Sequence, residues 1–208
     1  MTREEMIRRQ LMARDIVDEK VIQAMTKVPR EDFIPVTNRD YAYSDGPAPI
    51  GEGQTISQPY IVGLMVQTLQ LNDSCRVLEI GTGTGYHASI MGQIAKEVFS
   101  IEIVESLAKQ AKANIEKLKY TNIHIRCSDG YDGWSEEAPF DAISLAAAPS
   151  KIPEPLVEQL KLGGKLIAPI GTMAQNLILL EKDASGKMHT INLLPVRFVP
   201  MTGEAQRK

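Results

Sequence analysis

Cysteine, net charge and long apolar runs are all scarce in this sequence, and each shortage excludes a class of protein. The two cysteines, Cys75 and Cys127, lie far apart and form no paired motif. Such a pattern excludes a disulfide scaffold and favours a reducing, cytoplasmic location. The 23 Lys and Arg residues nearly balance the 26 Asp and Glu residues, for a net charge of −3. We therefore expect no nucleic-acid partner, because the chain lacks the basic character that such binding needs.

No apolar run approaches the roughly 18 residues that cross a bilayer. Residues 2–9 mix both signs of charge and lack the apolar centre of a signal peptide. We therefore expect no membrane partner. Hydrophobic residues make up 43% of the 208 and charged residues 24%, which excludes a disordered chain. This length predicts one domain with an added segment.

The first part of the chain contains two contrasting stretches. Residues 1–30 carry apolar side chains at helical spacing, with Ile7 and Leu11 four positions apart. Residues 35–59 contain four prolines and three glycines, which predict a long loop without a regular helix. Loops of this length inside a domain are more often functional than idle, although a surface linker is the alternative.

From residue 60 onward, short apolar segments alternate with helical patterns. Helices are expected at 60–69, 86–96, 105–118 and 154–160, and strands at 76–80, 98–103, 123–127, 141–146, 165–170, 176–181 and 193–199. This alternation predicts an α/β fold with a mostly parallel sheet covered by helices on both faces. The last two strands have no helix between them and predict an antiparallel hairpin. We expect a single domain over 1–208, in which 1–59 add helices and a loop to the core at 60–208.

A glycine loop follows the first core strand at Gly81, Gly83 and Gly85. Ligands of doubly wound sheets bind at the carboxyl ends of strands, where glycines let the backbone approach them. The spacing here is Gly-x-Gly-x-Gly, which differs from the dinucleotide fingerprint and lacks the Gly-Lys-Ser/Thr ending of a phosphate loop. A tight structural turn would also explain the glycines.

Three carboxylates accompany this loop. Glu79 lies in the first strand, Glu102 ends the second and Asp129 follows the third. A carboxylate at the position of Glu102 can accept both hydroxyls of a ribose. Three acids would repel a diphosphate but suit a nucleoside that carries a cation, such as S-adenosylmethionine. Helix caps or solvated strand ends are the alternative for these acids.

The chain resembles the protein-L-isoaspartate(D-aspartate) O-methyltransferase family over nearly its whole length. The most specific likeness is Gly-Glu-Gly-Gln-Thr-Ile-Ser-Gln-Pro-Tyr at 51–60, and residues 77–86 resemble the family's cofactor loop. Further segments match in order at 129–130, 140–143, 146–149, 160–166 and 196–203. One departure is Ser128, where the family more often has glycine before the aspartate.

This resemblance implies a Rossmann-like, class I S-adenosylmethionine-dependent methyltransferase with an N-terminal helical extension. The implied reaction transfers the methyl group of S-adenosyl-L-methionine to the free α-carboxylate of L-isoaspartyl residues, with D-aspartyl residues as further candidates. Loss of the methyl group converts the cofactor into S-adenosyl-L-homocysteine. The methyl ester then closes to a succinimide, which reopens partly to normal aspartate. The expected partners are isoaspartyl-containing proteins and peptides, and we expect a monomer.

The resemblance places the family's active-site serine at Ser57, which is expected to hold the attacking carboxylate or to order the sulfonium end of the cofactor. Ser57 is not expected to be a covalent nucleophile, because no base accompanies it in the motif. Capping the helix that starts near residue 60 is its alternative role. The expected cofactor-binding residues are Thr55, Ile56, Ser57, Glu79, Gly81, Thr82, Gly83, Gly85, Glu102, Ile103, Asp129, Gly130 and Thr202.

A general base is not required, because an aspartyl-type carboxylate with a pKa near about 4 is already ionised at neutral pH. The three histidines, His87, His124 and His189, are scattered without metal-ligand spacing, so we expect no metal and need no histidine as a base or as a metal ligand. For the substrate peptide, the expected recognition elements are the main chain at 143–149 and the loop at 47–57.

Three rival functions remain open from the sequence. A class I methyltransferase acting on a small-molecule carboxyl or another group would share the glycine loop, Glu102 and Asp129, but would not need the segment at 53–59. A nicotinamide-dependent oxidoreductase disagrees with the glycine spacing. A non-catalytic module could retain the cofactor pocket.

Overall fold

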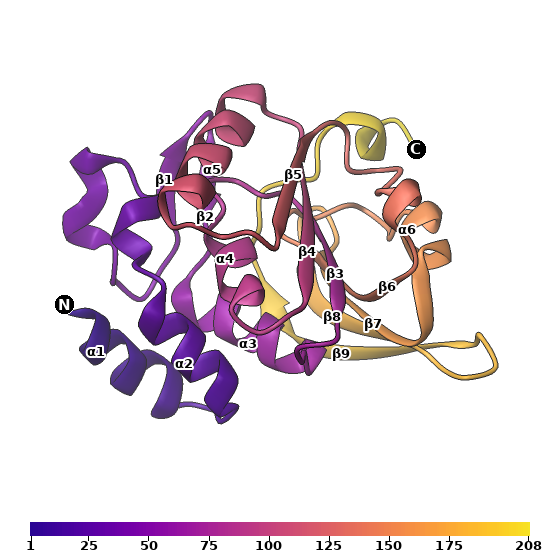
Figure 1. Cartoon of the computed structure of the whole chain (residues 1–208). Helices are drawn as coiled ribbons and strands as arrows, with labels where there is room; N and C mark the ends of the chain where they lie inside the picture. The colour runs from indigo at the N-terminus through magenta and orange to yellow at the C-terminus, as the bar shows by residue number, and fades with distance from the viewer.

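A seven-stranded sheet forms the centre of the molecule, and the computed structural model describes all residues 1–208 (Figure 1). The strand order is β5-β4-β3-β6-β7-β8-β9. The strands are β3 (Arg76–Ile80), β4 (Glu97–Glu102), β5 (Ile123–Cys127), β6 (Phe140–Leu145), β7 (Leu160–Ile170), β8 (Gln175–Lys182) and β9 (Met188–Val196). The first five run parallel and the last two pair antiparallel, which confirms the predicted sheet and its C-terminal hairpin. Because β4 and β6 lie on opposite sides of β3, the strand order reverses at β3, where such folds bind ligands.

Successive side chains of the parallel strands point into two different layers. Val77, Val98 and Ile167 belong to the larger apolar core, which the N-terminal helices and α3, α4 and α5 cover. Leu78 and Phe99, the next residues along their strands, belong to the smaller core beside α6. The covering helices are α3 (Pro59–Leu69), α4 (Tyr86–Gly92), α5 (Glu105–Lys117) and α6 (Glu154–Glu158).

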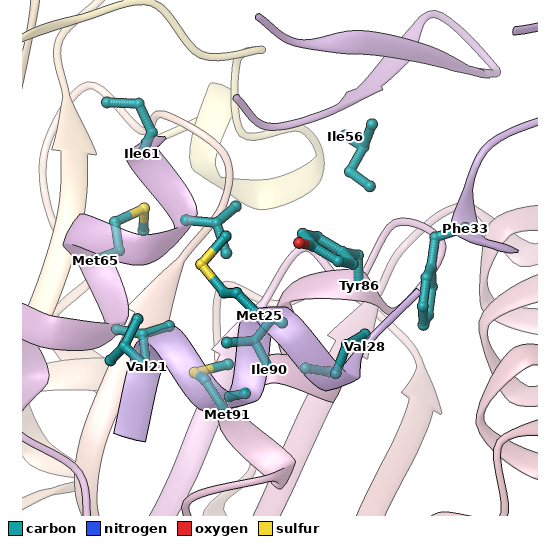
Figure 2. Packing of buried hydrophobic residues seen from close by; sticks show 14 of the residues in the cluster. Val21, Met25, Val28, Phe33, Ile56, Ile61, Met65, Tyr86, Ile90 and Met91 are labelled. Carbon is teal, nitrogen blue, oxygen red and sulfur yellow. The ribbon is translucent and has the colours of Figure 1, made fainter. Parts of the chain in front are cut away.

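The N-terminal helices pack directly on the helices that follow the sheet strands. The first, α1 (Arg3–Met6), continues as a π-helical turn to Met12, and α2 (Glu19–Lys27) begins at Asp18, whose carboxylate accepts the backbone N–H of Lys20 at 2.9 Å. Figure 2 shows Met25 of α2 among side chains of α3 and α4, including Met65 and Tyr86. The N-terminal extension therefore shares one apolar core with the sheet domain. None of the helices is both long and apolar enough to cross a membrane.

The Pro/Gly-rich stretch is more ordered than the sequence predicts. It was expected to be a loop, but it contains a 3-10 helix at Val36–Tyr41 and an antiparallel hairpin of β1 (Ala48–Gly51) and β2 (Gln54–Ile56). A tight turn makes this hairpin possible, with positive φ angles of 96° and 69° at Gly51 and Gly53. Only glycine adopts such angles readily, so the same residues that suggested a loop build the hairpin.

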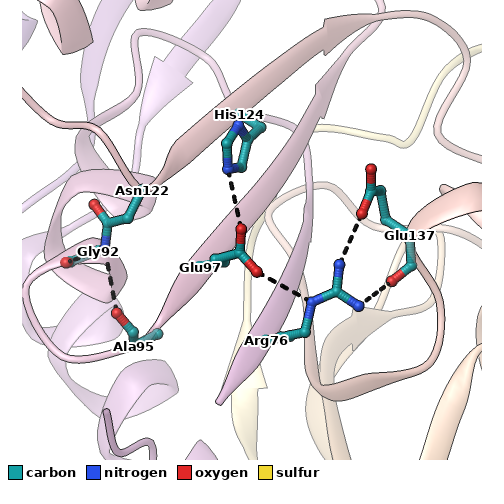
Figure 3. Close-up of polar contacts among 7 residues, drawn as sticks. All are labelled: Arg76, Gly92, Ala95, Glu97, Asn122, His124 and Glu137. Atoms are coloured by element: carbon teal, nitrogen blue, oxygen red, sulfur yellow. Dashed lines mark hydrogen bonds and ion pairs between the residues drawn. The ribbon is translucent and has the colours of Figure 1, made fainter. Parts of the chain in front are cut away.

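Side-chain contacts at the amino-terminal ends of the strands set two element boundaries. Asn122 donates to the carbonyls of Gly92 and Ala95 at 2.9 and 3.2 Å, where α4 ends four residues before its predicted limit (Figure 3). The same figure shows the Arg76 guanidinium between Glu97 and Glu137, at 3.3 and 2.7 Å. This polar group lies at the amino-terminal ends of β3 and β4, at the end of the strands opposite the glycine loop.

Candidate functional site

A cavity lies at the carboxyl ends of β3 and β4, beneath the β1–β2 hairpin and the C-terminal segment. We call it the inner cavity. It holds about 860 Å³ of space, part of it open to solvent. Ten of the thirteen predicted cofactor-binding residues line it, namely Thr55, Ile56, Ser57, Gly81, Thr82, Gly83, Glu102, Ile103, Gly130 and Thr202. The other three, Glu79, Gly85 and Asp129, do not line the cavity and lie behind its wall or at its margin.

The glycine loop forms the floor of the inner cavity. Gly81, Gly83 and Gly85 have positive φ angles of 94°, 57° and 92°, which explains their spacing in the sequence. The backbone N–H groups of Gly81 and Thr82 donate to the carbonyl of Ile101 at 2.8 and 3.2 Å, which ties the loop to β4. A Cβ atom on Gly83 would lie 3.2 Å from Ile50 of the hairpin. Without side chains here, the floor stays free for a ligand.

Glu102 connects the end of β4 to the glycine loop. One carboxylate oxygen accepts the backbone N–H of Gly83 at 2.7 Å, and the other accepts that of Val104 at 2.9 Å. The side chain is only 6% exposed, and the part that remains exposed faces the cavity. Because each carboxylate oxygen has a second lone pair, Glu102 can accept ligand hydroxyls without giving up these bonds.

Asp129 holds the C-terminal segment in place. Its two oxygens accept the backbone N–H groups of Tyr131 and Glu204, at 2.9 and 2.8 Å. The segment is also paired with Ala148, which donates to Val199 at 2.9 Å and accepts from Met201 at 2.8 Å. This arrangement places Thr202 on the cavity wall, while the Asp129 carboxylate is turned to the backbone that closes the cavity.

Glu79 is buried completely under the glycine loop, beside a histidine that the sequence analysis left without a role. The Ser100 hydroxyl donates to one oxygen of Glu79, and His87 Nδ1 lies 3.5 Å from the other. Burial raises the pKa of Glu79 to about 8 and lowers the pKa of His87 to about 4. His87 lines the inner cavity from the first turn of α4. No sequence signal marked it, because its contact with Glu79 exists only in the folded chain.

Glu79 is expected to make the protein less stable as the pH rises from about 5 to about 8. Its pKa is raised from 4.5 to about 8 in the folded state, so over this interval the unfolded chain releases the proton and the folded chain keeps it. Stability therefore falls with rising pH, by up to a few kcal/mol. In thermal unfolding at pH 5 and pH 8, Glu79→Gln should gain stability relative to the native protein at the higher pH. Glu116→Gln, at an exposed position of α5, is the control and should show no such gain.

A second cavity opens next to the first, and we call it the outer cavity. It holds about 1200 Å³ of space, part of it open to solvent. The segment 194–199 lines it together with Pro47, Thr55 and Ser57. The sequence analysis predicted the loop at 47–57 here but did not assign 194–199 to the substrate side. Of the predicted segment 143–149, only Ala146 lines this cavity.

Four residues line both cavities, namely Thr55, Ser57, Ala146 and Val199. Ser57 does not cap α3, as one reading of the sequence had it, because the helix is preceded by Gln58 and starts at Pro59. It lies instead at the junction, where ligands in the two cavities would meet.

The two cavities differ in charge. No Lys or Arg lines the inner cavity, and its one acid is Glu102. Such a lining does not fit a diphosphate, which cations usually bind. The outer cavity is lined by two cations, Arg14 and Arg197, and by no acid. Arg14 is paired with Asp45, so Arg197 is the cation left free for an anionic ligand. The structure brings together no group of three or more His, Cys, Asp or Glu residues that could hold a metal ion.

The sheet order, the glycine loop at its switch point and the acid at the end of β4 define a class I S-adenosylmethionine-dependent methyltransferase. The family model of the protein-L-isoaspartate(D-aspartate) O-methyltransferases matches residues 1–206. The chain therefore belongs to this family, as its motifs predicted.

Individual relatives agree with this assignment. The chain is 52% identical to protein-L-isoaspartate O-methyltransferase 2 of Shewanella sediminis, over 98% of this chain and 84% of the relative. It is 51% identical to protein-L-isoaspartate O-methyltransferase of Opitutus terrae, over 97% of this chain and 87% of the relative. A solved structure described as a protein-L-isoaspartate O-methyltransferase of Plasmodium falciparum, in complex with S-adenosyl-L-homocysteine, superposes with a TM-score of 0.85 at 29% identity. That match covers 97% of this chain and 99% of the other.

Proposed function

We propose that this protein is a repair methyltransferase, which moves the methyl group of S-adenosylmethionine to the α-carboxylate of L-isoaspartyl residues in damaged proteins and peptides. The observation that carries the proposal is the junction of the two cavities at Ser57. Methyl transfer requires the donor sulfur, the methyl group and the acceptor oxygen to lie in one line, and a shared wall lets two ligands approach in this way.

The lining of the inner cavity supports S-adenosylmethionine as the cofactor. When bound, this group supplies a methyl carbon activated by the neighbouring sulfonium. Its nucleoside has no phosphate, in agreement with a cavity that lacks Lys and Arg. The hydroxyl of Thr84 and His87 Nε2 are buried without a hydrogen-bond partner, which supports a polar ligand in this place.

The roles of the individual residues follow from their positions. Glu102 would accept the ribose hydroxyls, and Ile103 and Gly130 would line the adenine side. Asp129 would support that side by holding the backbone of Tyr131 and Glu204. The loop Gly81, Thr82, Gly83 and Gly85 would pass beneath the methionine part, with Glu79 under it. On the hairpin, Thr55 and Ile56 would flank the reacting centre, and Thr202 would close the cavity over the cofactor.

The chain's part in the reaction is to orient the acceptor and to exclude water. The acceptor carboxylate is anionic at neutral pH, so no residue needs to remove a proton. Arg197, which makes no ion pair, gives the outer cavity a charge that suits this anion, whereas Arg14 is paired with Asp45. Ser57 would hold the attacking carboxylate by donating its hydroxyl proton in a hydrogen bond. The segment 194–199 and the loop at 47–57 would bind the main chain of an extended peptide.

Paired peptides test this function. Two peptides of one sequence, one with isoaspartate and one with aspartate, are incubated with S-adenosylmethionine labelled in its methyl group. We expect base-labile label in the isoaspartyl peptide only, and a further peptide with D-aspartate tests the wider substrate range. Equal labelling of the first two peptides, or none, would contradict the proposal and favour a small-molecule acceptor.

We further propose that residues 1–208 act as one unit, as a monomer in the cytoplasm and without nucleic acid. Both cavities are built from a single chain, and residues 1–59 share an apolar core with residues 60–208, in support of this view. Sedimentation at several protein concentrations, with and without added RNA, measures the mass and would reveal a dimer or a complex.

A further inference from the structure

The outer cavity has room for more than the reacting residue of a substrate. It holds about 1200 Å³ of space, part of it open to solvent. A cavity of about 300–1,000 Å³ is already enough for most of a small ligand. Thr55, Ser57, Ala146 and Val199 mark its inner end, because they also line the inner cavity. With the isoaspartate held at this end, the rest of the outer cavity would contact the residues that flank it in a peptide.

Arg197 carries the one charge in the lining of the outer cavity that no other residue neutralises. Arg14, the other cation, is paired with Asp45, and its Cζ atom lies 4.6 Å from the centre of the Tyr60 ring. Asp45 also accepts a hydrogen bond from Gln58 at 2.6 Å, so both members of this ion pair are engaged in further contacts. Arg197 is exposed and makes no ion pair, which leaves its guanidinium available to a ligand.

The backbone on both sides of Arg197 is held in place. Val196, at the end of β9, pairs with Gln175 of β8. The side-chain amide of Gln175 also binds Phe198, since it accepts from the N–H at 2.6 Å and donates to the carbonyl at 3.1 Å. Arg197 is thus fixed two residues before Val199, which lines both cavities, and two residues of extended chain span at most about 7 Å. Its charge therefore lies just outside the place where acceptor and donor would meet.

The charge balance of methyl transfer decides which anion suits Arg197. An oxygen of the acceptor carboxylate forms a bond to the methyl carbon, the bond from this carbon to the sulfonium breaks, and its electron pair stays on the sulfur. The negative and positive charges disappear together. An ion pair between Arg197 and the acceptor would weaken toward the transition state, so it would stabilise the bound substrate more than the transition state and slow the reaction. Arg197 can attract the acceptor from a distance, but a direct ion pair suits an anion that keeps its charge.

We propose that Arg197 determines substrate specificity by binding an acidic side chain that lies within about three residues of the isoaspartate in an extended peptide. The inference rests on the proposed function and deepens it, because it names isoaspartyl peptides with a neighbouring Asp or Glu as the preferred substrates. A carboxylate matches a guanidinium in charge and can accept two parallel hydrogen bonds from it. A Lys at the same place in the peptide would be repelled.

Three isoaspartyl peptides of one sequence test this specificity, with Glu, Gln or Lys placed two residues before and two residues after the isoaspartate. For the native protein we expect kcat/KM to be about three- to fivefold higher with Glu than with Gln, and about tenfold higher with Glu than with Lys, as is usual for ion pairs open to water. The difference should appear in KM, because the ion pair is present equally in the bound substrate and in the transition state. Raising the salt concentration from about 20 to about 500 mM should reduce the preference by screening.

Charge reversal at Arg197 gives the sharper result. Arg197→Glu should invert the order, so that the Lys peptide becomes the best substrate, and Arg197→Gln should make the three peptides similar. Each ratio compares peptides on one variant, so a loss of activity common to all peptides cancels. Lys187→Glu is the matched control, since it changes the net charge by the same amount at the other end of β9 and should keep the native order.

The outcomes separate the specificity from the function itself. If the native protein methylates none of the three isoaspartyl peptides, the proposed function fails. If it methylates all three equally well, or if Arg197→Glu keeps the native order, the function stands and the role of Arg197 is wrong. Inversion of the order in Lys187→Glu as well would also contradict the inference, because the total charge rather than Arg197 would then set the preference.

Discussion

Ser57→Ala is expected to lower kcat for an isoaspartyl peptide about 100-fold while S-adenosylhomocysteine binds within about threefold of its native affinity. Ser57 lines both cavities, so its hydroxyl lies where acceptor and donor would meet. Losing one donor that orients a reacting oxygen commonly costs this much in rate. The cofactor should keep its other contacts, since Glu102 and the glycine loop do not involve Ser57. Steady-state kinetics and calorimetry measure the two effects separately.

Two further variants define what the Ser57 result means. Ser57→Thr keeps a hydroxyl and should retain more activity than Ser57→Ala. Ser185→Ala removes a hydroxyl from the exposed turn between β8 and β9 and should leave kcat unchanged. Native turnover in Ser57→Ala would remove this serine from the mechanism, and a loss of cofactor affinity equal to the loss in kcat would make it a binding residue only.

The sequence predicted the sheet well for two reasons. The side chains of each core strand are mostly apolar and point alternately into the two apolar layers, and the segments between the parallel strands are long enough to contain a helix. Its predictions were poorer where a boundary depends on a distant partner. The end of α4 is set by Asn122, thirty residues after Gly92, and no local pattern reveals that bond. The hairpin at 48–56 was hidden for a related reason, because its glycines indicate a turn but not the register that pairs Pro49 with Thr55.

The site was predictable where motif and backbone coincide. The glycine loop and Glu102 follow directly from a strand, so their place was set by the topology. His87 and the segment 194–199 were missed, since they come next to the other site residues only through tertiary contacts. The burial of Arg30, outside both cavities, also depends on tertiary contacts. This charged side chain is fully buried, donates to the carbonyl of Ala42 and lies 4.9 Å from the ring of Tyr86 at the start of α4.

Glu102→Ala is expected to weaken S-adenosylhomocysteine at least about 100-fold, since two bonds from ribose hydroxyls to a carboxylate contribute about 1.5–3 kcal/mol each. The variant also leaves the N–H of Gly83 without its acceptor, which loosens the glycine loop. Glu102→Gln should lose less, because the amide still has one accepting oxygen. Glu97→Gln is the matched control, since Glu97 lies at the other end of β4 and pairs with Arg76 and His124 (Figure 3). Calorimetry measures all three, and native affinity in Glu102→Ala would show that the ribose is bound elsewhere.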